Sequence, residues 1–257
     1  RMIMADSVIQ RIIAAVESKC KDTQYEKIVF SFFGGEPLLT LDKVIKPIIK
    51  RVGEICTLHD KEFLLHFTTN GYLINNKLFD IIEGIPTSFQ IPLDGNAYVH
   101  NKTKTIRGVD GTYHRTIENI KSCLKKGLSI TVRLNFTRST LPFFIDIIDD
   151  FSDLNSSERQ LLKFNFQRVW QDDVTNDDFD LISSIRNIER NFMESGLSVS
   201  PYTSNHFGIC YADDRNSIVV NYDGNLFNCT AFFILILSRI THLRNNDITN
   251  PLSRNLW

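Results

Sequence analysis

The stretch KIVFSFFGGEPLL, Lys27 to Leu39, joins an apolar segment to a two-glycine turn, an acid and a proline. Its first seven residues are mostly β-branched or aromatic, which is typical of a strand covered on both faces in a parallel sheet. Gly34 and Gly35 can adopt backbone angles closed to residues with a Cβ, and they let a ligand approach the main chain. Pro37 disfavours helical angles at Glu36, so the exit of the turn is stiff. The join predicts a binding turn at a strand end, suited to a ligand ammonium group.

Strand-like and helix-like segments alternate along the rest of the chain. The expected strands are Lys27–Phe33, Phe63–Thr69, Ser88–Leu93, Ser129–Thr137 and Leu161–Trp170. The expected helices are an opening helix through Ile9 and Val16, then Asp42–Ile55, Asn76–Glu83, Tyr113–Leu124, Pro142–Leu154 and a last one through Phe179 and Phe192. Pro47 should kink or shift the second helix. Repeated strand–helix units imply an α/β fold with a parallel sheet and right-handed crossovers.

The composition of the chain limits which classes of protein it can belong to. The 257 residues are enough for one barrel-type domain and a small appendage. With 29 basic and 30 acidic residues the formal charge is −1, so nucleic acid is not an expected partner. The longest apolar run, AFFILIL at 231–237, is shorter than the roughly 20 residues of a membrane span, so no membrane role is expected. Five irregularly spaced cysteines favour a reducing cytoplasm over a disulfide framework.

Polar residues stand where each expected strand ends. In barrels of parallel strands, ligands gather at the C-terminal strand ends, so we expect these groups to converge on one mouth. They are Gly34 to Glu36, Thr69 with Asn70, Asp94, Asn135 with Phe136, and Gln167 with Arg168. The alternative stays open that GGEP is a plain tight connection and that Asn70-Gly71 and Asp94-Gly95 are ordinary turns.

The segment Cys210 to Cys229 places Asp223-Gly224 between two short β-prone runs, which predicts a β-hairpin. Its cysteines flank a glycine in the order Cys, thirteen residues, Gly, four residues, Cys. The alternative is a hairpin with two unrelated buried cysteines. Cys20, Cys56 and Cys123 fall on expected helices without metal-like spacing and are interpreted as small core residues.

The strand–GGEP join, TTNG, LDG and the Cys–Gly–Cys pattern follow in the order found in radical S-adenosylmethionine (SAM) enzymes. From about Ser7 to Thr230 the sequence resembles the peptide- and protein-modifying maturases with a C-terminal SPASM extension, such as anaerobic sulfatase maturases. The resemblance implies an open partial (β/α)6 barrel whose first strand is missing here, with a short C-terminal β-hairpin. It also implies three parts: a barrel at 1–200, the start of the SPASM extension at 201–230, and an atypical tail at 231–257.

The resemblance also implies cofactors and a reaction. The parent protein would reductively cleave SAM, chelated to a [4Fe-4S] cluster, to a 5′-deoxyadenosyl radical that abstracts hydrogen from a peptide or protein side chain. An external electron donor is expected. The implied cofactor-binding residues are Gly34, Gly35, Glu36, Asn70, Asp94 and Asn135; Cys210 and Cys229 would be ligands of an auxiliary iron–sulfur cluster.

Two interpretations remain open for other polar residues. By the resemblance, Arg133 and Asn135 would contact the SAM carboxylate or ribose; alternatively, they form a solvated or salt-bridged strand face. Arg115 is a further candidate for the carboxylate, and His66 is interpreted as a core histidine. His100 resembles a loop histidine that recurs in these maturases.

The sequence departs from the family pattern in three places. Relatives often carry serine at the position of Pro92, which removes a hydroxyl contact to SAM. The CxxxCxxC triplet for the catalytic cluster and the later SPASM cysteines are absent from the 257 residues. The chain therefore resembles a piece truncated at both ends, and we expect this fragment to be inactive by itself. The alternative function is a degenerate radical SAM fold that binds peptides without catalysis.

Overall fold

The computed structural model describes residues 3–169, 172, 178–202, 214, 216–228 and 241–242. Contacts divide the chain into two compact units. The first unit comprises Arg1–Ile28, Thr40–Phe63 and Asn205–Trp257; the second comprises Val29–Leu39 and Leu64–Ser204. The three parts expected from the sequence, 1–200, 201–230 and 231–257, stay a prediction.

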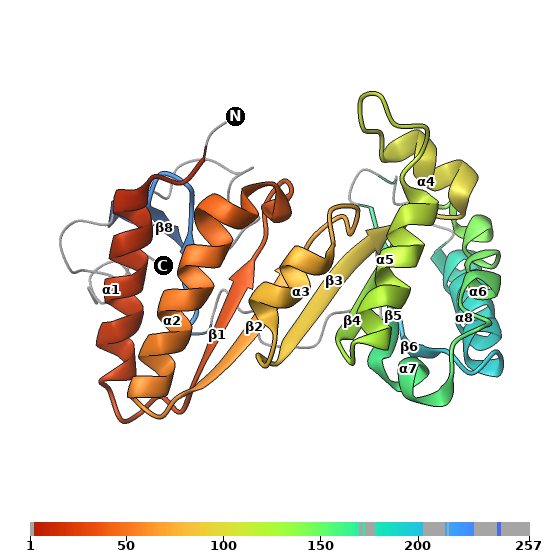
Figure 1. The fold of residues 1–257 in the computed structure, drawn as a ribbon. Helices are drawn as coiled ribbons and strands as arrows, with labels where there is room; N and C mark the ends of the chain where they lie inside the picture. The colour runs from red at the N-terminus through yellow and green to blue at the C-terminus, as the bar shows by residue number, and fades with distance from the viewer. Residues whose placement is uncertain are drawn as a thin grey trace. The chain divides into compact units, whose positions relative to one another are not determined.

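A six-stranded sheet has its strands in chain order, and all of it except the first two residues of β1 and of β2 belongs to the second unit (Figure 1). Its strands are β1 (Lys27–Phe32), β2 (Glu62–Thr68), β3 (Thr87–Leu93), β4 (Ser129–Phe136), β5 (Leu162–Arg168) and β6 (Ser198–Ser200). All pairs from β2 to β6 are parallel. The α/β class and the five expected strands are confirmed. The sequence analysis missed β6, which is too short to show a period.

Helices alternate with the strands. They are α1 (Asp6–Cys20), α2 (Lys46–Leu58), α3 (Asn76–Ile82), α4 (Ala97–Thr103), α5 (Tyr113–Lys125), α6 (Ile147–Asp150), α7 (Ser156–Leu161) and α8 (Asp178–Glu194). Short turns precede some of them: a 3-10 helix at Pro37–Thr40, a π-helix at Leu41–Ile45 and a 3-10 helix at Leu141–Phe144. Pro47 lies in the first turn of α2, directly after the π-helix, so the irregular part of this helical segment adjoins the proline.

Two expectations about helices were wrong. The single helix expected over Pro142–Leu154 is broken into the Leu141–Phe144 turn and α6, and α7 follows. No helix was expected between Glu83 and Tyr113, but the segment after Asp94 contains α4. Asn96 caps this helix, because its side chain accepts a hydrogen bond from the backbone N–H of Val99 at 3.2 Å.

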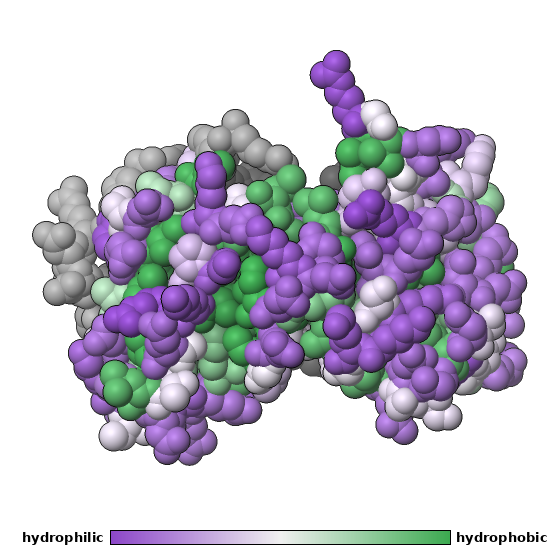
Figure 2. Space-filling view, in the orientation of Figure 1, coloured by the Kyte–Doolittle hydropathy of each residue, from purple (hydrophilic) through white to green (hydrophobic). Residues whose placement is uncertain are grey.

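The two faces of the central strands differ. Along β3, β4 and β5 buried apolar residues alternate with less buried, mostly polar ones. Helix α5 packs on β4, α7 on β5 and α8 on β6, so the apolar face is the one covered by helices. Figure 1 shows α3 and α5 on one side of the strands, and Figure 2 shows that the surface drawn in this orientation is predominantly hydrophilic over these helices.

Aromatic rings fill the covered face. Phe32, Phe67 and Phe89 stack across β1, β2 and β3 with ring centroids 5.1 and 5.2 Å apart. On β5 the Phe164 ring meets Phe151 at 5.4 Å and Phe192 of α8 at 4.9 Å, both edge to face. Such pairs add to the stabilisation that comes from burying apolar area. This core fixes the strand ends on which the polar groups stand.

In the first unit, α1 packs against α2. Strands β7 (Val219–Val220) and β8 (Asn225–Phe227) pair antiparallel around Asp223-Gly224, which confirms the expected hairpin. Strand β9 (Thr241–His242) pairs with β8. Within the described residues, no helix has the length and apolar character needed to cross a bilayer.

Candidate functional site

The two-glycine turn after β1 leaves its backbone open. Gly34 has a φ of +126°, which disfavours any residue with a Cβ, whereas the φ of Gly35 lies outside that region. A Cβ built on either glycine would meet nothing within 4 Å. A ligand can therefore approach the main chain at this strand end without displacing a side chain.

The Glu36 carboxylate ties this turn to the end of β2. Its Oε1 accepts hydrogen bonds from the backbone N–H of Leu38 at 3.1 Å and from the Thr69 hydroxyl at 2.7 Å. Its Oε2 accepts one from the backbone N–H of Asn70 at 2.8 Å. An ionised carboxylate has about four lone-pair positions, so one on Oε2 is left for a further donor. The expected residues Gly34 to Glu36 and Asn70 are thus brought together.

A second group forms at the ends of β3 and β4. The Asp94 Oδ1 accepts a hydrogen bond from the Asn135 amide at 3.1 Å, and its Oδ2 accepts one from the Thr103 hydroxyl at 3.0 Å. The Lys104 ammonium lies 3.4 Å from the same Oδ2. Asp94 and Asn135 were expected from the sequence. Thr103 and Lys104 were missed because the sequence analysis placed no helix there.

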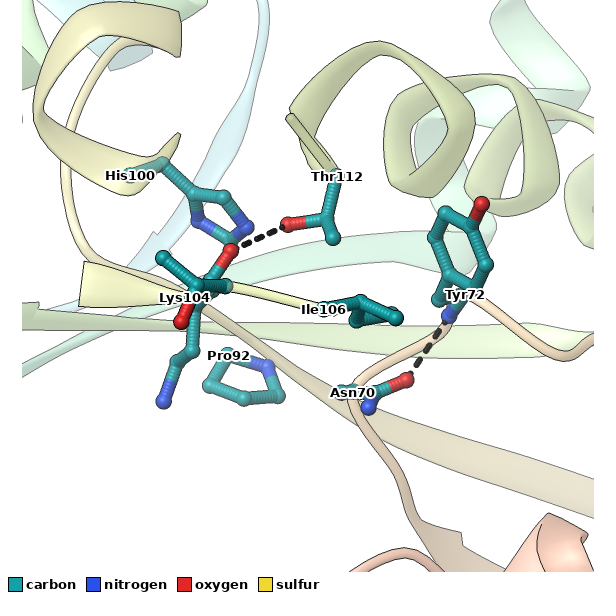
Figure 3. A pocket seen from close by; sticks show the side chains of 8 residues that line it. Asn70, Tyr72, Pro92, His100, Lys104, Ile106 and Thr112 are labelled. Atoms are coloured by element: carbon teal, nitrogen blue, oxygen red, sulfur yellow. Dashed lines mark hydrogen bonds between the residues drawn. The ribbon is translucent and has the colours of Figure 1, made fainter. Parts of the chain in front are cut away.

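A cavity of about 80 Å³ lies between these groups (Figure 3). It is lined by Asn70, Tyr72, Pro92, His100, Lys104, Thr105, Ile106 and Thr112. The ends of β2 and β3 contribute Asn70 and Pro92, while α4 and the segment after it contribute His100 and Lys104. The Asn70 amide oxygen accepts a hydrogen bond from the Tyr72 N–H at 2.9 Å, which fixes the amide at the cavity wall. Of the expected strand-end groups, Asn70 is the one among the lining residues, so the convergence of all of them on one mouth stays a prediction.

Hydrogen bonds hold together the two ends of the segment from Lys104 to Thr112. The Asn101 amide oxygen accepts hydrogen bonds from the backbone N–H groups of Thr112 at 2.8 Å and Tyr113 at 3.0 Å. The Thr112 hydroxyl donates to the Lys104 carbonyl at 3.0 Å (Figure 3). Gly111 leaves room for Asn101, since an added Cβ would come within 2.5 Å of its amide nitrogen.

The buried His100 side chain forms a hydrogen bond with the backbone at the end of β3. It is 2% exposed, and its Nδ1 accepts a hydrogen bond from the Asp94 backbone N–H at 3.4 Å. Burial lowers the pKa of His100 to about 4, with Asp94 raising it and Lys104 lowering it. The imidazole is therefore neutral near pH 7, as an acceptor at Nδ1 requires.

We expect this burial to make stability depend on pH. The folded-state pKa of about 4 lies below the ordinary value of 6.5, so the unfolded chain takes up the proton first. The free energy of unfolding should fall as pH drops from about 6.5 towards about 4, by up to about 3 kcal/mol. The His100→Asn variant keeps an acceptor but does not titrate. Across this window, urea unfolding should show that the free energy of unfolding of the wild type falls relative to that of the variant. A difference between the two proteins that does not change with pH would contradict the expectation.

The remaining candidates are placed as follows. The His66 Nδ1 is 2.9 Å from the Ser88 hydroxyl, but His66 is half-buried on the less buried face of β2 and does not lie in the apolar core as expected. Arg115 donates from Nε to the Tyr72 carbonyl at 3.1 Å and stacks over the Tyr72 ring at 4.7 Å. The side chains expected at the end of β5 form hydrogen bonds with residues nearby in the sequence: Gln167 donates to Asn165, and Arg168 donates to Asp172. Phe136 is buried in the core and contributes no polar group.

The described residues do not fit an iron–sulfur cluster. Cys210 and Cys229 lie outside them, so their role as ligands stays a prediction. Cys20, Cys56 and Cys123 are buried, and burial raises the pKa of Cys56 and of Cys123 to about 12, which disfavours the thiolate that binds metal. No group of three His, Cys, Asp or Glu side chains suited to a metal ion occurs in the part of the chain that the structure describes.

Comparisons with known proteins give few sequence matches. No model of a protein family matches the chain. The uncharacterized protein sll1766 of Synechocystis sp. is 30% identical over 89 residues, which make up 35% of this chain and 22% of that protein. The match thus spans far less than two thirds of that relative.

Solved structures match much more of the chain. The structure of anSMEcpe with bound AdoMet (SAM) has a TM-score of 0.71 at 16% identity, over 98% of this chain and 71% of that one. The structure of anSMEcpe with AdoMet and the Cp18Cys peptide gives 0.70 at 16%, over 98% and 72%. Streptococcus suis SuiB bound to its precursor peptide SuiA gives 0.64 at 13%, over 96% and 59%. The chain therefore has the fold of the radical SAM enzymes anSMEcpe and SuiB.

Proposed function

We propose that this chain is the SAM- and peptide-binding part of a radical SAM maturase that modifies a peptide or protein side chain. The observation that carries the proposal is the open two-glycine turn, tied through Glu36 to the end of β2. Structures of anSMEcpe contain AdoMet and a peptide, and a structure of SuiB contains its precursor peptide. The shared fold supports carrying these ligand classes over to this chain.

The residues of the turn fit the methionyl end of SAM. Its ammonium would lie against the open backbone of Gly34 and Gly35 and use the remaining lone pair on Glu36 Oε2. Asn70, Asp94 and Asn135 would border the rest of the molecule from the ends of β2, β3 and β4. SAM would supply, on one-electron reduction and cleavage, a 5′-deoxyadenosyl radical able to remove hydrogen from the peptide. The described residues would bind and orient SAM.

Gly35→Val should abolish or strongly weaken SAM binding without unfolding the protein. Because an added side chain at Gly35 meets nothing within 4 Å, it would occupy the space proposed for the ligand and not clash with the protein. Isothermal titration calorimetry with SAM should show at least a tenfold loss of affinity, together with an unchanged thermal unfolding midpoint.

The control is Gly53→Ala on α2, where an added Cβ would make an ordinary 3.7 Å contact with the Phe63 ring. This variant should bind SAM like the wild type. Equal SAM affinity in Gly35→Val and the wild type would refute the placement. Absence of SAM binding in the wild type would favour the alternative function, a peptide-binding module without catalysis.

A further inference from the structure

The Asp94 carboxylate at the end of β3 is held on both of its oxygens. Its Oδ1 accepts a hydrogen bond from the Asn135 amide at 3.1 Å, and its Oδ2 accepts one from the Thr103 hydroxyl at 3.0 Å. The Lys104 ammonium lies 3.4 Å from Oδ2, and the Asp94 side chain is only 14% exposed. An ionised carboxylate has about four lone-pair positions, so these donors leave one on Oδ1. The protein thus fixes the orientation of this carboxylate before a ligand reaches it.

The Thr103 hydroxyl has one proton and three acceptors close to it. The acceptors are Asp94 Oδ2 at 3.0 Å, the His100 carbonyl at 3.0 Å and the Val99 carbonyl at 3.4 Å. A hydrogen bond to a charged acceptor is roughly twice as strong as one to a neutral carbonyl, which favours the carboxylate. If the proton pointed to His100, a hydroxyl lone pair would face Oδ2 without a proton between the two oxygens. Thr103 is therefore a donor to Asp94.

Helix α4 folds back, so that its last residue, Thr103, lies at the end of β3. Gly95 has a φ of +132°, and a Cβ on it would come within 2.9 Å of the Val99 Cβ, so glycine lets α4 pack against the strand end. Asn96 caps the first turn of α4, and its amide donates to Asp146 Oδ2 at 2.8 Å. The helix is thereby also held at the end opposite to Thr103.

We propose that Thr103 is a positioning residue for SAM binding: it fixes the Asp94 carboxylate so that the lone pair left on Oδ1 accepts a hydrogen bond from SAM. The inference rests on the proposed function, in which Asp94 borders SAM. A free aspartate side chain must be ordered when a ligand binds, and a hydrogen bond formed beforehand avoids this cost. Thr103 suits the role better than Lys104. Threonine is branched at Cβ and stiff, whereas the Lys104 side chain is flexible and 40% exposed.

The first measurement is made without ligand. It follows the side-chain amide resonances of Asn135 in the ¹⁵N-labelled protein, assigned by their loss in Asn135→Asp. Thr103→Val keeps the shape of the side chain but removes the donor, so it should shift these resonances, because the carboxylate that accepts from Asn135 is released. Thr103→Ser keeps the donor and should leave them in place. Thr103 is exposed, so neither change disturbs the core.

The second measurement is calorimetry with SAM. Thr103→Val should weaken SAM binding at least about threefold, whereas Thr103→Ser should bind SAM like the wild type. In the Asp94→Ala background, Thr103→Val should have no further effect, because the carboxylate through which it acts is gone. The matched control is Thr87→Val at the opposite end of β3, where the hydroxyl donates to the Ile85 carbonyl at 2.7 Å. This variant should leave both the SAM affinity and the Asn135 resonances unchanged.

Any of three results would overturn the inference. Asn135 resonances that stay in place in Thr103→Val would show that the hydroxyl does not hold Asp94. An unchanged SAM affinity in Thr103→Val would show that the hydrogen bond does not matter for binding. A loss of affinity that is equal in Thr103→Ser, or that persists in the Asp94→Ala background, would show that Thr103 acts by another route. The proposed function fails separately: if the wild type binds no SAM while Thr103→Val still shifts the Asn135 resonances, Thr103 positions Asp94 and the identity of the ligand is wrong.

Discussion

Phe164→Ala is expected to lower the free energy of unfolding by about 3–5 kcal/mol, the range for removing a fully buried aromatic ring. The Phe164 side chain is 0% exposed on strand β5. Its ring meets Phe151 and Phe192 edge to face at 5.4 and 4.9 Å, so the cavity left by alanine is lined by rings from separate segments. Because β5 lies inside the sheet, the surroundings cannot collapse without moving both neighbouring strands.

Urea unfolding followed by circular dichroism should show a lower midpoint with an unchanged denaturant slope. Phe143→Ala is the matched control, since Phe143 is 38% exposed, and its loss should cost less than about 1 kcal/mol. A loss below about 1 kcal/mol in Phe164→Ala would show that the β5–α8 contact does not form as described.

The alternation of β-prone runs with helical spacing was enough to predict five of the strands and a parallel sheet. Strand β4 shows why: Ile130, Val132 and Leu134 alternate with Thr131 and Arg133, and the structure buries the first set. The pattern works because a strand side chain alternates between faces regardless of what covers them. The hairpin at Asp223-Gly224 followed from turn chemistry in the same local way.

Elements that depend on neighbours were not predictable. Over Pro142–Leu154 the apolar residues have a helical spacing, yet the helix is interrupted between Phe144 and Ile147. Both of these side chains are 0% exposed, so packing fixes them and overrides the local preference for one helix. Strand β6 has only three residues, and its pairing with β5 defines it.

The sequence was enough to predict which residues at the strand ends belong to the candidate site, but not the hydrogen bonds that connect them. The sequence indicated the glycine turn, Asn70, Asp94 and Asn135, since each follows an expected strand. It gave no sign that Glu36 accepts three hydrogen bonds, because its partners lie up to 34 residues away. The support of Asp94 by His100 was equally hidden, as it depends on the position of α4.

Glu36→Gln is expected to weaken SAM binding about 10- to 100-fold, because a charge-assisted hydrogen bond of about 1.5–3 kcal/mol to the ligand ammonium is lost. Glu36→Ala should in addition lower the free energy of unfolding by about 2–4 kcal/mol, since the Thr69 hydroxyl and the Asn70 N–H lose their acceptors. Thr69 is 2% exposed, so water cannot readily replace the carboxylate there.

Glu36→Gln turns one of the two accepting oxygens into an NH2 donor, so it too should lower the free energy of unfolding, by less than Glu36→Ala does. The role of Glu36 in binding is therefore taken from calorimetry under conditions in which both variants remain folded. Calorimetry with SAM and urea unfolding should be measured on both, with Glu118→Gln, an exposed acid on α5, as the control for a lost charge. If Glu36→Gln bound SAM like the wild type, the lone pair left on Oε2 would have no ligand to accept from. The carboxylate would then only brace the turn, because its three protein donors alone would account for an acid at this position.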